Sequence, residues 1–290
     1  MTEENRLTDI RTVRELLSRH GFHFSKAMGQ NFLINPTVCP RMAEACGASP
    51  ETGVLEIGPG IGVLTRELAA LAGRVVAVEL DERLLPVLRE TLAGRENTEV
   101  VQGDILKLPL AALLEEKFTR PDGARMPVAV CANLPYYITS PIIMLLLESR
   151  LPFTSLTVMV QKEAADRLCA APGTRECGAV SLAVQYYARA EKLFGVSRGS
   201  FMPAPNVDSA VIRLTLHGQP PCTCRDEAQL FRVIRTAFGQ RRKTLANALA
   251  GVYTKEKAAA AIEAAGLPAS ARAEQLTLEQ FARLADQLAE

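Results

Sequence analysis

From residue 53 onward, short apolar runs rich in β-branched residues alternate with segments of helical periodicity. The runs lie at 54–57, 74–80, 100–102, 128–132 and 156–160. Because these runs are largely continuous rather than alternating with polar residues, both faces of each strand must be covered, as in a parallel sheet flanked by helices. The pattern predicts an α/β, Rossmann-like fold, and 48% hydrophobic residues suffice to bury its core.

The end of the chain has a different character. A helical pattern at 178–190 precedes two further strand candidates, 192–198 and 209–216, which are expected to close the sheet as a hairpin at its edge. A break with Gly218, Pro220 and Pro221 follows, and no strand candidate comes after it. The remaining residues show three helical patterns, at 226–250, 254–265 and 277–290.

We therefore predict two domains, an α/β domain at 1–218 and a small all-α domain at 219–290. The first domain includes an N-terminal helical extension at 1–28. Residues 7–20 have the pattern of an amphipathic helix, with apolar side chains at helical spacing on one face.

The first strand candidate ends in a glycine loop, Glu56-Ile57-Gly58-Pro59-Gly60-Ile61-Gly62. A dinucleotide loop would need Gly-x-Gly-x-x-Gly, but Val63 and Thr65 stand where the two possible registers require the third glycine. The loop matches in full the Glu-x-Gly-x-Gly-x-Gly pattern of S-adenosylmethionine (SAM) methyltransferases. We therefore expect Gly58 and Gly60 to contact SAM, and an NAD-dependent oxidoreductase is disfavoured.

Two carboxylates follow the next two strand candidates. Glu79 ends the second strand, where it is placed to accept both ribose hydroxyls of SAM. Asp104 follows the third strand, where it is placed to accept from the adenine amino group. Ligands of parallel sheets bind at the carboxyl ends of the strands, so both positions suit a cofactor site. The alternative is that each residue merely caps a helix or turn.

The fourth strand candidate leads into Asn133-Leu134-Pro135-Tyr136, the (Asn/Asp/Ser)-(Pro/Leu)-Pro-(Tyr/Phe) form of methyltransferases that act on planar exocyclic amines. Adenine N6 is a poor nucleophile because its lone pair is delocalised into the ring. The Asn133 side-chain oxygen and a backbone carbonyl, that of Leu134, can accept the two N6 hydrogens and aim the nitrogen at the methyl donor. Tyr136 can stack on the base, which is worth ~1–3 kcal/mol. The alternative is a proline turn with a core tyrosine.

With these motifs the chain resembles the small-subunit (16S) ribosomal RNA adenine N6,N6-dimethyltransferase family over nearly its whole length. The matching segments are 29–33, 56–62, 78–81, 103–104, 133–136, 161–163, 201–211 and 240–244. The resemblance implies SAM-dependent dimethylation of two adjacent adenines in the 3'-terminal hairpin loop of that RNA, in ribosome biogenesis, with S-adenosylhomocysteine as the product.

The resemblance also assigns roles to single residues. It implies cofactor contacts from Asn31, Leu33, Gly58, Glu79, Asp104 and Asn133. It further implies that Phe201 forms a second aromatic face, so that the target base is sandwiched between Phe201 and Tyr136. Read from the residues alone, Phe201 is better explained as a core aromatic before a proline-rich turn.

A local basic segment stands out in a chain whose net charge is only +1. Residues 225–250 contain six basic and two acidic side chains, a net charge of +4. We expect the following residues to contact RNA phosphates: Lys26, Arg232, Arg235, Arg241, Arg242 and Lys243. The alternative is a solvated helix face.

Several classes of protein and site are disfavoured. No apolar run approaches the ~18 residues that span a bilayer, and the acidic start, Met1-Thr2-Glu3-Glu4, is unlike a secretory signal. The seven cysteines lack zinc-ligand spacing. We expect a cytoplasmic monomer without a metal, acting on small-subunit rRNA or a pre-30S particle. Two rivals stay open: a large-subunit rRNA adenine methyltransferase, and a non-catalytic RNA-binding assembly factor that retains the fold.

Overall fold

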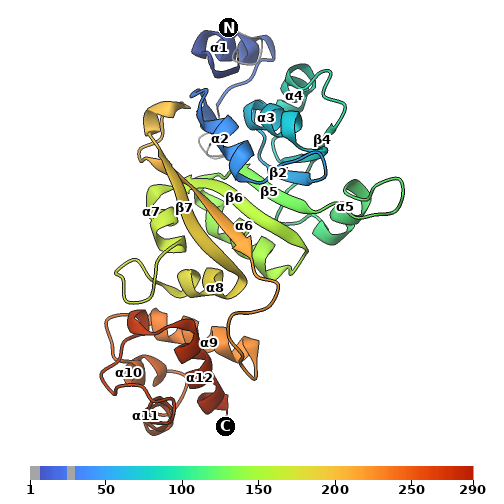
Figure 1. Cartoon of the computed structure of the whole chain (residues 1–290). Helices are drawn as coiled ribbons and strands as arrows, with labels where there is room; N and C mark the ends of the chain where they lie inside the picture. The colour runs from blue at the N-terminus through green and yellow to red at the C-terminus, as the bar shows by residue number, and fades with distance from the viewer. Residues whose placement is uncertain (1–6, 25–29, 290) are drawn as a thin grey trace. The chain divides into compact units, whose positions relative to one another are not determined.

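The computed structural model describes residues 7–24 and 30–289 (Figure 1). Its contacts divide the chain into two compact units. The first unit takes in the chain up to Ala165 together with Glu191–Leu216, and the second takes in Asp166–Ala190 and the chain from His217 onward.

A seven-stranded sheet forms the centre of the first unit, with the strand order β4-β3-β2-β5-β6-β9-β7. The strands are β2 (Gly53–Ile57), β3 (Arg74–Glu79), β4 (Thr98–Gln102), β5 (Val128–Asn133), β6 (Phe153–Gln161), β7 (Ala188–Val196) and β9 (Ser209–Leu216). Strands β2 to β6 pair in parallel, whereas β9 runs antiparallel to β6. The predicted α/β fold is confirmed, and β7 and β9 are neighbours at one edge, as expected of the last two strands.

The burial of the strands explains their composition. Every residue of β2 is buried, and so are all residues of β3 and β5 except one at an end of each strand. Strand β4 lies at the opposite edge from β7 and is only partly buried. Continuous Val, Ile and Ala runs therefore occupy the centre of the sheet, where both faces are covered.

The helices of the first unit connect the strands (Figure 1). They are α1 (Ile10–Arg19), α2 (Val38–Ala45), α3 (Val63–Leu71), η2 (Glu82–Leu84), α4 (Leu85–Thr91), α5 (Leu110–Lys117), η3 (Tyr136–Ile138) and α6 (Thr139–Glu148). The boundary between the two units falls within α7 (Lys162–Leu168). Helices α2 and α5 are not among the predicted elements, since each has only eight residues and α2 carries Pro40 in its first turn. Among the described residues, no helix is long and apolar enough to cross a membrane.

A short two-stranded ribbon joins two distant parts of the first unit. Strand β1 (Phe32–Leu33) pairs antiparallel with β8 (Phe201–Met202), with Leu33 opposite Phe201. A short 3-10 turn, η4 (Arg198–Ser200), leads into β8. The ribbon holds the segment that follows Gln30 beside the loop between β7 and β9. Strands of two residues are too short to produce a recognisable sequence pattern, so this pairing is not predicted.

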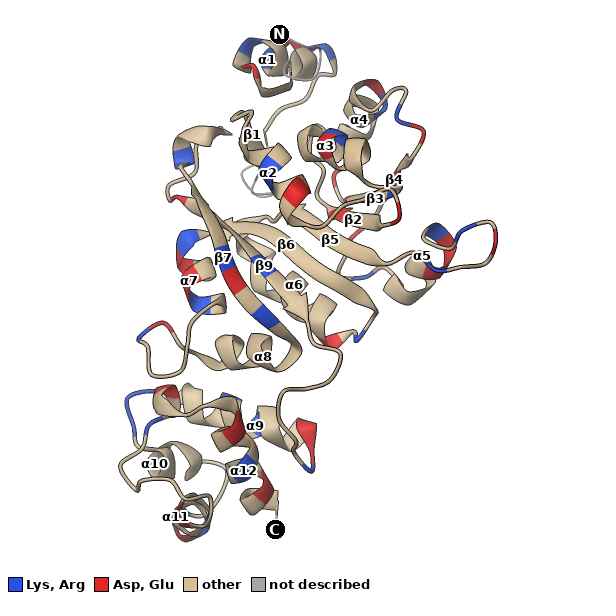
Figure 2. Ribbon diagram, viewed as in Figure 1, with Lys and Arg blue, Asp and Glu red and all other residues tan. Residues whose placement is uncertain are grey.

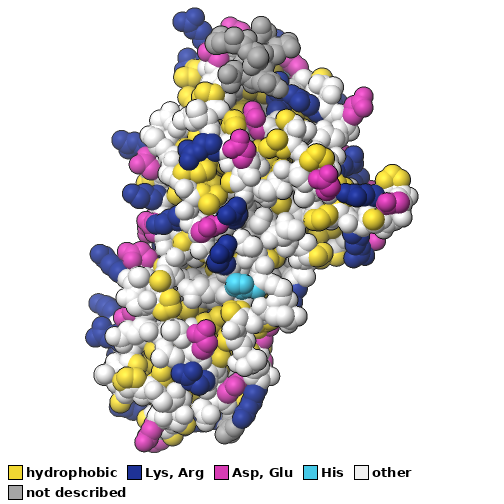
Figure 3. Space-filling model, in the orientation of Figure 1, with side chains coloured by type: hydrophobic (Ala, Val, Ile, Leu, Met, Phe, Trp, Pro, Cys, Tyr) yellow, Lys and Arg dark blue, Asp and Glu magenta, His cyan; other side chains and the backbone are white. Residues whose placement is uncertain are grey.

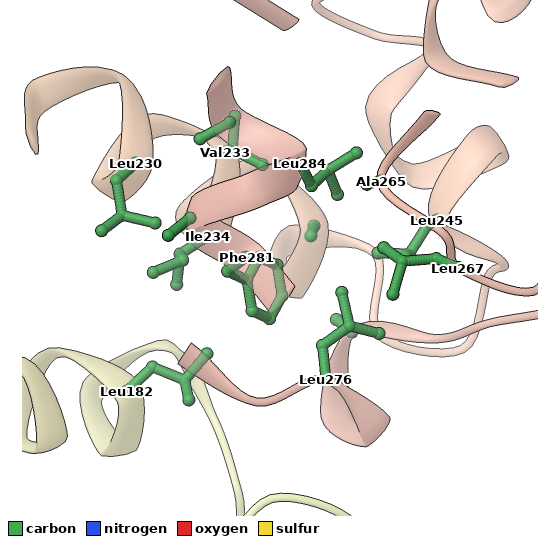
Figure 4. Close-up of a cluster of buried hydrophobic side chains, with 14 of the residues drawn as sticks. Leu182, Leu230, Val233, Ile234, Leu245, Ala265, Leu267, Leu276, Phe281 and Leu284 are labelled. Atoms are coloured by element: carbon green, nitrogen blue, oxygen red, sulfur yellow. The ribbon is translucent and has the colours of Figure 1, made fainter. Parts of the chain in front are cut away.

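The second unit is helical and has its own core (Figure 4). Its helices are α8 (Ala179–Tyr187), α9 (Glu227–Gly239), α10 (Leu245–Leu249), α11 (Lys255–Ala264), η5 (Ala273–Gln275) and α12 (Leu278–Ala289). Leu182 of α8 is part of that core together with Ile234 and Phe281. Residues 166–190 therefore group with the helices of the second unit, whereas the predicted first domain extends to residue 218.

Two predicted helix boundaries differ from the structure. The helix predicted at 226–250 is interrupted between α9 and α10, because Gln240 leaves helical geometry (φ −129°, ψ 52°) directly after Gly239, a poor helix former. The helix predicted at 178–190 ends at Tyr187, since β7 begins at Ala188.

The core of the helical unit can be tested at Phe281, which is fully buried and stacks on Phe238 with 6.0 Å between ring centroids. Phe281→Ala should lower the free energy of unfolding of this unit by about 3–5 kcal/mol, because it removes a large side chain from a packed core. Val252→Ala changes a side chain that is 43% exposed, and should alter the free energy of unfolding by less than about 0.5 kcal/mol. Urea unfolding followed by circular dichroism measures both, and equal effects would contradict this description of the core.

Candidate functional site

One pocket at the carboxyl ends of β2, β3 and β5 collects most of the predicted site residues. The predicted residues that line it are Asn31, Leu33, Gly58, Gly60, Glu79, Asp104, Asn133, Leu134, Pro135 and Tyr136. Met42, Ile142 and Met159 contribute apolar lining. The structure thus brings together the N-terminal motif, the glycine loop, the two carboxylates and the tetrapeptide, although their individual roles stay predictions.

The glycine loop between β2 and α3 adopts a conformation that favours glycine. Gly58, Gly60 and Gly62 have φ angles of 70°, 60° and 86°, in the left-handed region that side chains disfavour. A Cβ atom on Gly60 would also lie 3.2 Å from the Phe32 ring. The backbone can therefore turn tightly and approach a ligand closely, which is what the motif predicts.

Glu79, at the end of β3, is a buried carboxylate held in one orientation. Its Oε1 accepts a hydrogen bond from the backbone N–H of Asp81 at 2.8 Å, and its Oε2 accepts one from the N–H of Gly60 at 3.2 Å. Burial raises its pKa, and these backbone hydrogen bonds oppose the rise. A carboxylate has about four acceptor positions, so these two bonds leave capacity for a ribose diol.

Asp104 lies after β4 and lines the same pocket. Its Oδ1 accepts a hydrogen bond from the backbone N–H of Leu106 at 3.0 Å, and the Nζ of Lys107 lies 3.5 Å from its Oδ2. The carboxylate therefore caps its own turn, as the alternative interpretation holds, and its side chain is still 28% exposed toward the pocket or solvent. Capping and contact with an adenine amino group are compatible.

The tetrapeptide Asn133–Tyr136 joins the end of β5 to η3. Leu134 is 1% exposed, and its N–H donates to the carbonyl of Met159 at 3.1 Å, which fixes the backbone against β6. Tyr136 is half-buried, and its hydroxyl lies 2.7 Å from the Oγ of Ser209. Burial raises the pKa of Tyr136, so the phenol is neutral at physiological pH.

Phe201 is buried beside residues that line the pocket. It is 3% exposed and packs in a core cluster with Leu33, Met159 and Val211. Phe201 is not among the residues that line the pocket in the described part of the chain. The role implied for it, as a second aromatic face for the base, stays a prediction.

Sequence reasoning gave no role to Glu56, the first residue of the glycine motif. Its side chain is 1% exposed, it lines the pocket, and among the described residues its Oε2 has no hydrogen-bond partner. Burial raises the pKa of Glu56 to about 8. The sequence signal that could have identified Glu56 is an acidic residue within an otherwise apolar strand.

The basic residues of the second unit fall on two elements. Arg232 and Arg235 are exposed on α9, and Arg241–Lys243 form the turn between α9 and α10 (Figure 2). Arg241 is partly buried and donates to the carbonyl of Arg175. Lys26 lies outside the described residues. Elsewhere on the face in Figure 3, positive and negative side chains are interspersed, in keeping with a net charge of +1.

The site can be compared with known proteins. The family model described as "Ribosomal RNA adenine dimethylase" matches residues 21–290. A Geobacillus thermodenitrificans protein named ribosomal RNA small subunit methyltransferase A is 48% identical over 281 residues, 95% of this chain and 94% of its own. A protein of the same name from Streptococcus thermophilus is 44% identical over 290 residues, 98% of this chain and 99% of its own.

Two solved structures resemble the chain. The 23S rRNA methyltransferase ErmE has a TM-score of 0.65 and 31% identity, and the match covers 90% of this chain and 100% of that one. A dimethyladenosine transferase from Plasmodium falciparum has a TM-score of 0.70 and 25% identity, covering 87% of this chain and 95% of that one.

The protonation of Glu56 gives a pH test of the site. Its pKa of about 8 in the folded chain lies above the usual value of 4.5, so the unfolded chain loses this proton at lower pH than the folded chain. The free energy of unfolding should therefore fall as pH rises from about 5 to 8. Glu56→Gln, which keeps the size but cannot ionise, should flatten that dependence. Urea unfolding of both chains at several pH values measures it, and parallel pH curves would contradict it.

Proposed function

The chain belongs to the ribosomal RNA adenine dimethylase family, and on that premise we propose that it dimethylates N6 of two adjacent adenines in the 3'-terminal hairpin loop of 16S rRNA. It is a SAM-dependent rRNA adenine dimethyltransferase that acts in ribosome biogenesis. The observation that carries the proposal is the convergence, in one pocket, of Glu79, Asp104 and Asn133–Tyr136.

The residues of the pocket suit SAM. The buried Glu79 carboxylate, held by two backbone N–H groups, fits a ribose diol, and Asp104 fits an adenine amino group. Asn31 and the loop at Gly58 and Gly60 would contact the amino-acid arm of the cofactor. When bound, SAM supplies a methyl carbon activated by a positively charged sulfur.

The chain's own residues would orient the acceptor. The side-chain oxygen of Asn133 and the carbonyl of Leu134 accept the two N6 hydrogens of the target adenine, which turns the nitrogen lone pair toward the methyl group. Tyr136, anchored through Ser209, provides a face on which the base stacks. The N6 proton becomes acidic only after methyl transfer and passes to water, so the reaction needs no metal and no dedicated base.

The RNA would be held by the basic residues of the second unit. An A-form duplex hides the edges of its bases, so the target adenines must be unstacked in a loop and flipped into the pocket. Arg232, Arg235 and the turn at 241–243 would contact phosphates, with Lys26 as a further contact. We propose that the protein works as a monomer in the cytoplasm, on rRNA within a pre-30S particle.

A substrate assay tests this function. The protein is incubated with methyl-labelled SAM and either unmethylated small-subunit particles or large subunits. Label is expected on N6 of two adjacent adenines in the small subunit. Label on large-subunit adenines instead would favour the activity named for ErmE, to which the chain is structurally similar, and absence of label from both would reject the proposal.

Replacement of Asn133 tests the positioning of the amine. Asn133→Ala should lower the methylation rate at saturating SAM and RNA by about 100-fold or more, because the acceptor that orients N6 is lost. Binding of the RNA, measured by filter retention at fixed salt, should stay within about twofold. Equal loss of methylation and RNA binding would instead make Asn133 a structural residue.

Neutralising the turn between α9 and α10 tests the RNA surface. The double change Arg242→Gln and Lys243→Gln should weaken RNA binding and reduce the slope of log K against log salt concentration by about 1–2, because fewer counterions are released. Lys255→Gln removes another exposed charge of the same unit and should leave the slope unchanged. An unchanged slope in the double variant would show that this turn does not contact the RNA.

A further inference from the structure

Asp81, two residues beyond Glu79, forms hydrogen bonds with two residues that line the pocket, Gln30 and Glu79. Its side chain is 5% exposed. Oδ2 accepts a hydrogen bond from the Gln30 Nε2 at 2.7 Å, and Arg83 donates to Oδ1 at 2.8 Å and to Oδ2 at 2.6 Å. A buried charge with this many donors is fixed in position.

Asp81 acts on Glu79 through the backbone. The Asp81 N–H donates to the Glu79 Oε1, so the position of the Asp81 backbone sets the direction of that carboxylate. On the other side, Gln30 immediately precedes Asn31, and both line the pocket. Asp81 therefore links Glu79, proposed for the ribose, through its backbone N–H to the N-terminal motif, proposed for the amino-acid arm, through its carboxylate.

The N-terminal segment, residues 7–24, reaches this link through an aromatic contact. The Arg83 guanidinium lies 5.2 Å from the centre of the Phe22 ring, within range of a cation–π interaction. Phe22 lies 5.9 Å from Phe32, whose ring packs beside Gly60. The segment thus contacts the Asp81 loop directly through Arg83, and it reaches the glycine loop through Phe32.

Other contacts fasten the N-terminal segment to α4. Leu16 and Leu17 of α1 share a buried cluster with Leu84 and Leu88. Arg19 pairs with Glu90, and the His20 Nε2 lies 2.7 Å from the Glu90 Oε2. The segment is therefore packed against the helix that follows the Asp81 loop.

We propose that Asp81 is a positioning residue for the methyl donor, and that the N-terminal segment helps to set cofactor affinity by supporting Asp81 through Phe22 and Arg83. This inference rests on the proposed function, because it assumes that the pocket takes SAM. It assigns a role to the N-terminal extension, which carries no recognisable motif of its own.

A simpler role for Asp81 is to cap the turn η2, since its Oδ1 also accepts from the Arg83 backbone N–H at 3.1 Å. The two roles differ in what Gln30 does. A cap needs only the Arg83 backbone, whereas the positioning role requires the side-chain bond to Gln30. Loss of either partner of that bond should then weaken cofactor binding.

The test is a double-mutant cycle with Asp81→Ala and Gln30→Ala, in the full chain. The affinity for S-adenosylhomocysteine, measured by titration calorimetry without RNA or turnover, should fall about 10-fold in each single variant. The double variant should stay within about twofold of Asp81→Ala, because both changes break the same bond. At saturating SAM and RNA, kcat should change less than about twofold while the KM for SAM rises.

Matched controls accompany the cycle. Glu99→Gln removes a different ion-paired carboxylate, one that pairs with Arg74 and Lys117, and should leave affinity for S-adenosylhomocysteine unchanged. Phe22→Leu should weaken it by about 2–5-fold through loss of the ring beneath Arg83, whereas Ile10→Ala, at an exposed position of α1, should not. Thermal unfolding checks that each variant folds.

The outcomes separate this inference from the proposed function. If the unaltered chain binds neither SAM nor S-adenosylhomocysteine, the proposed function fails. If the unaltered chain binds but Gln30→Ala binds equally well, or the effects of the two single changes multiply in the double variant, only the positioning role of Asp81 is overturned. If Phe22→Leu matches the unaltered chain, the part assigned to the N-terminal segment is overturned.

Discussion

Two backbone N–H groups, from Gly60 and Asp81, hold the carboxylate of Glu79, and the geometry of the pocket depends on this arrangement. Removing a carboxylate from water is costly, and backbone donors offset that cost only if both loops keep their conformation. The left-handed φ of Gly60 secures one loop, and the side-chain contacts of Asp81 secure the other. The acidic residue at the end of β3 is thereby kept in place before any ligand arrives.

The sequence predicted the sheet and the pocket because both depend on local patterns. Continuous apolar runs identify buried parallel strands, and the carboxyl ends of such strands lie at one edge of the sheet whatever their lengths. The positions of Glu79, Asp104 and Asn133 at that edge follow directly. No role is predicted for Glu56, because the burial that leaves its Oε2 without a hydrogen-bond partner among the described residues results from packing, which a motif does not specify.

Other features depend on contacts between residues far apart in sequence. The grouping of α8 with the C-terminal helices is set by Leu182 and Tyr186, which pack in the helical core. Both residues lie well before residue 218, where the first predicted domain ends. The interruption at Gln240 changes the presentation of Arg241–Lys243 from a helix face to a turn. The link from Phe22 to Asp81 runs through side chains alone, so no sequence pattern reveals it.

The bond between Tyr136 and Ser209 joins residues 73 positions apart. Ser209 is the first residue of β9, which lies between β6 and β7 in the sheet. A ribosome that has released the five parallel strands has therefore not yet released the residue that anchors the tyrosine. Synthesis of the chain must pass Ser209 before Tyr136 is anchored, so a truncated product that keeps the glycine loop still lacks the base platform proposed for this tyrosine.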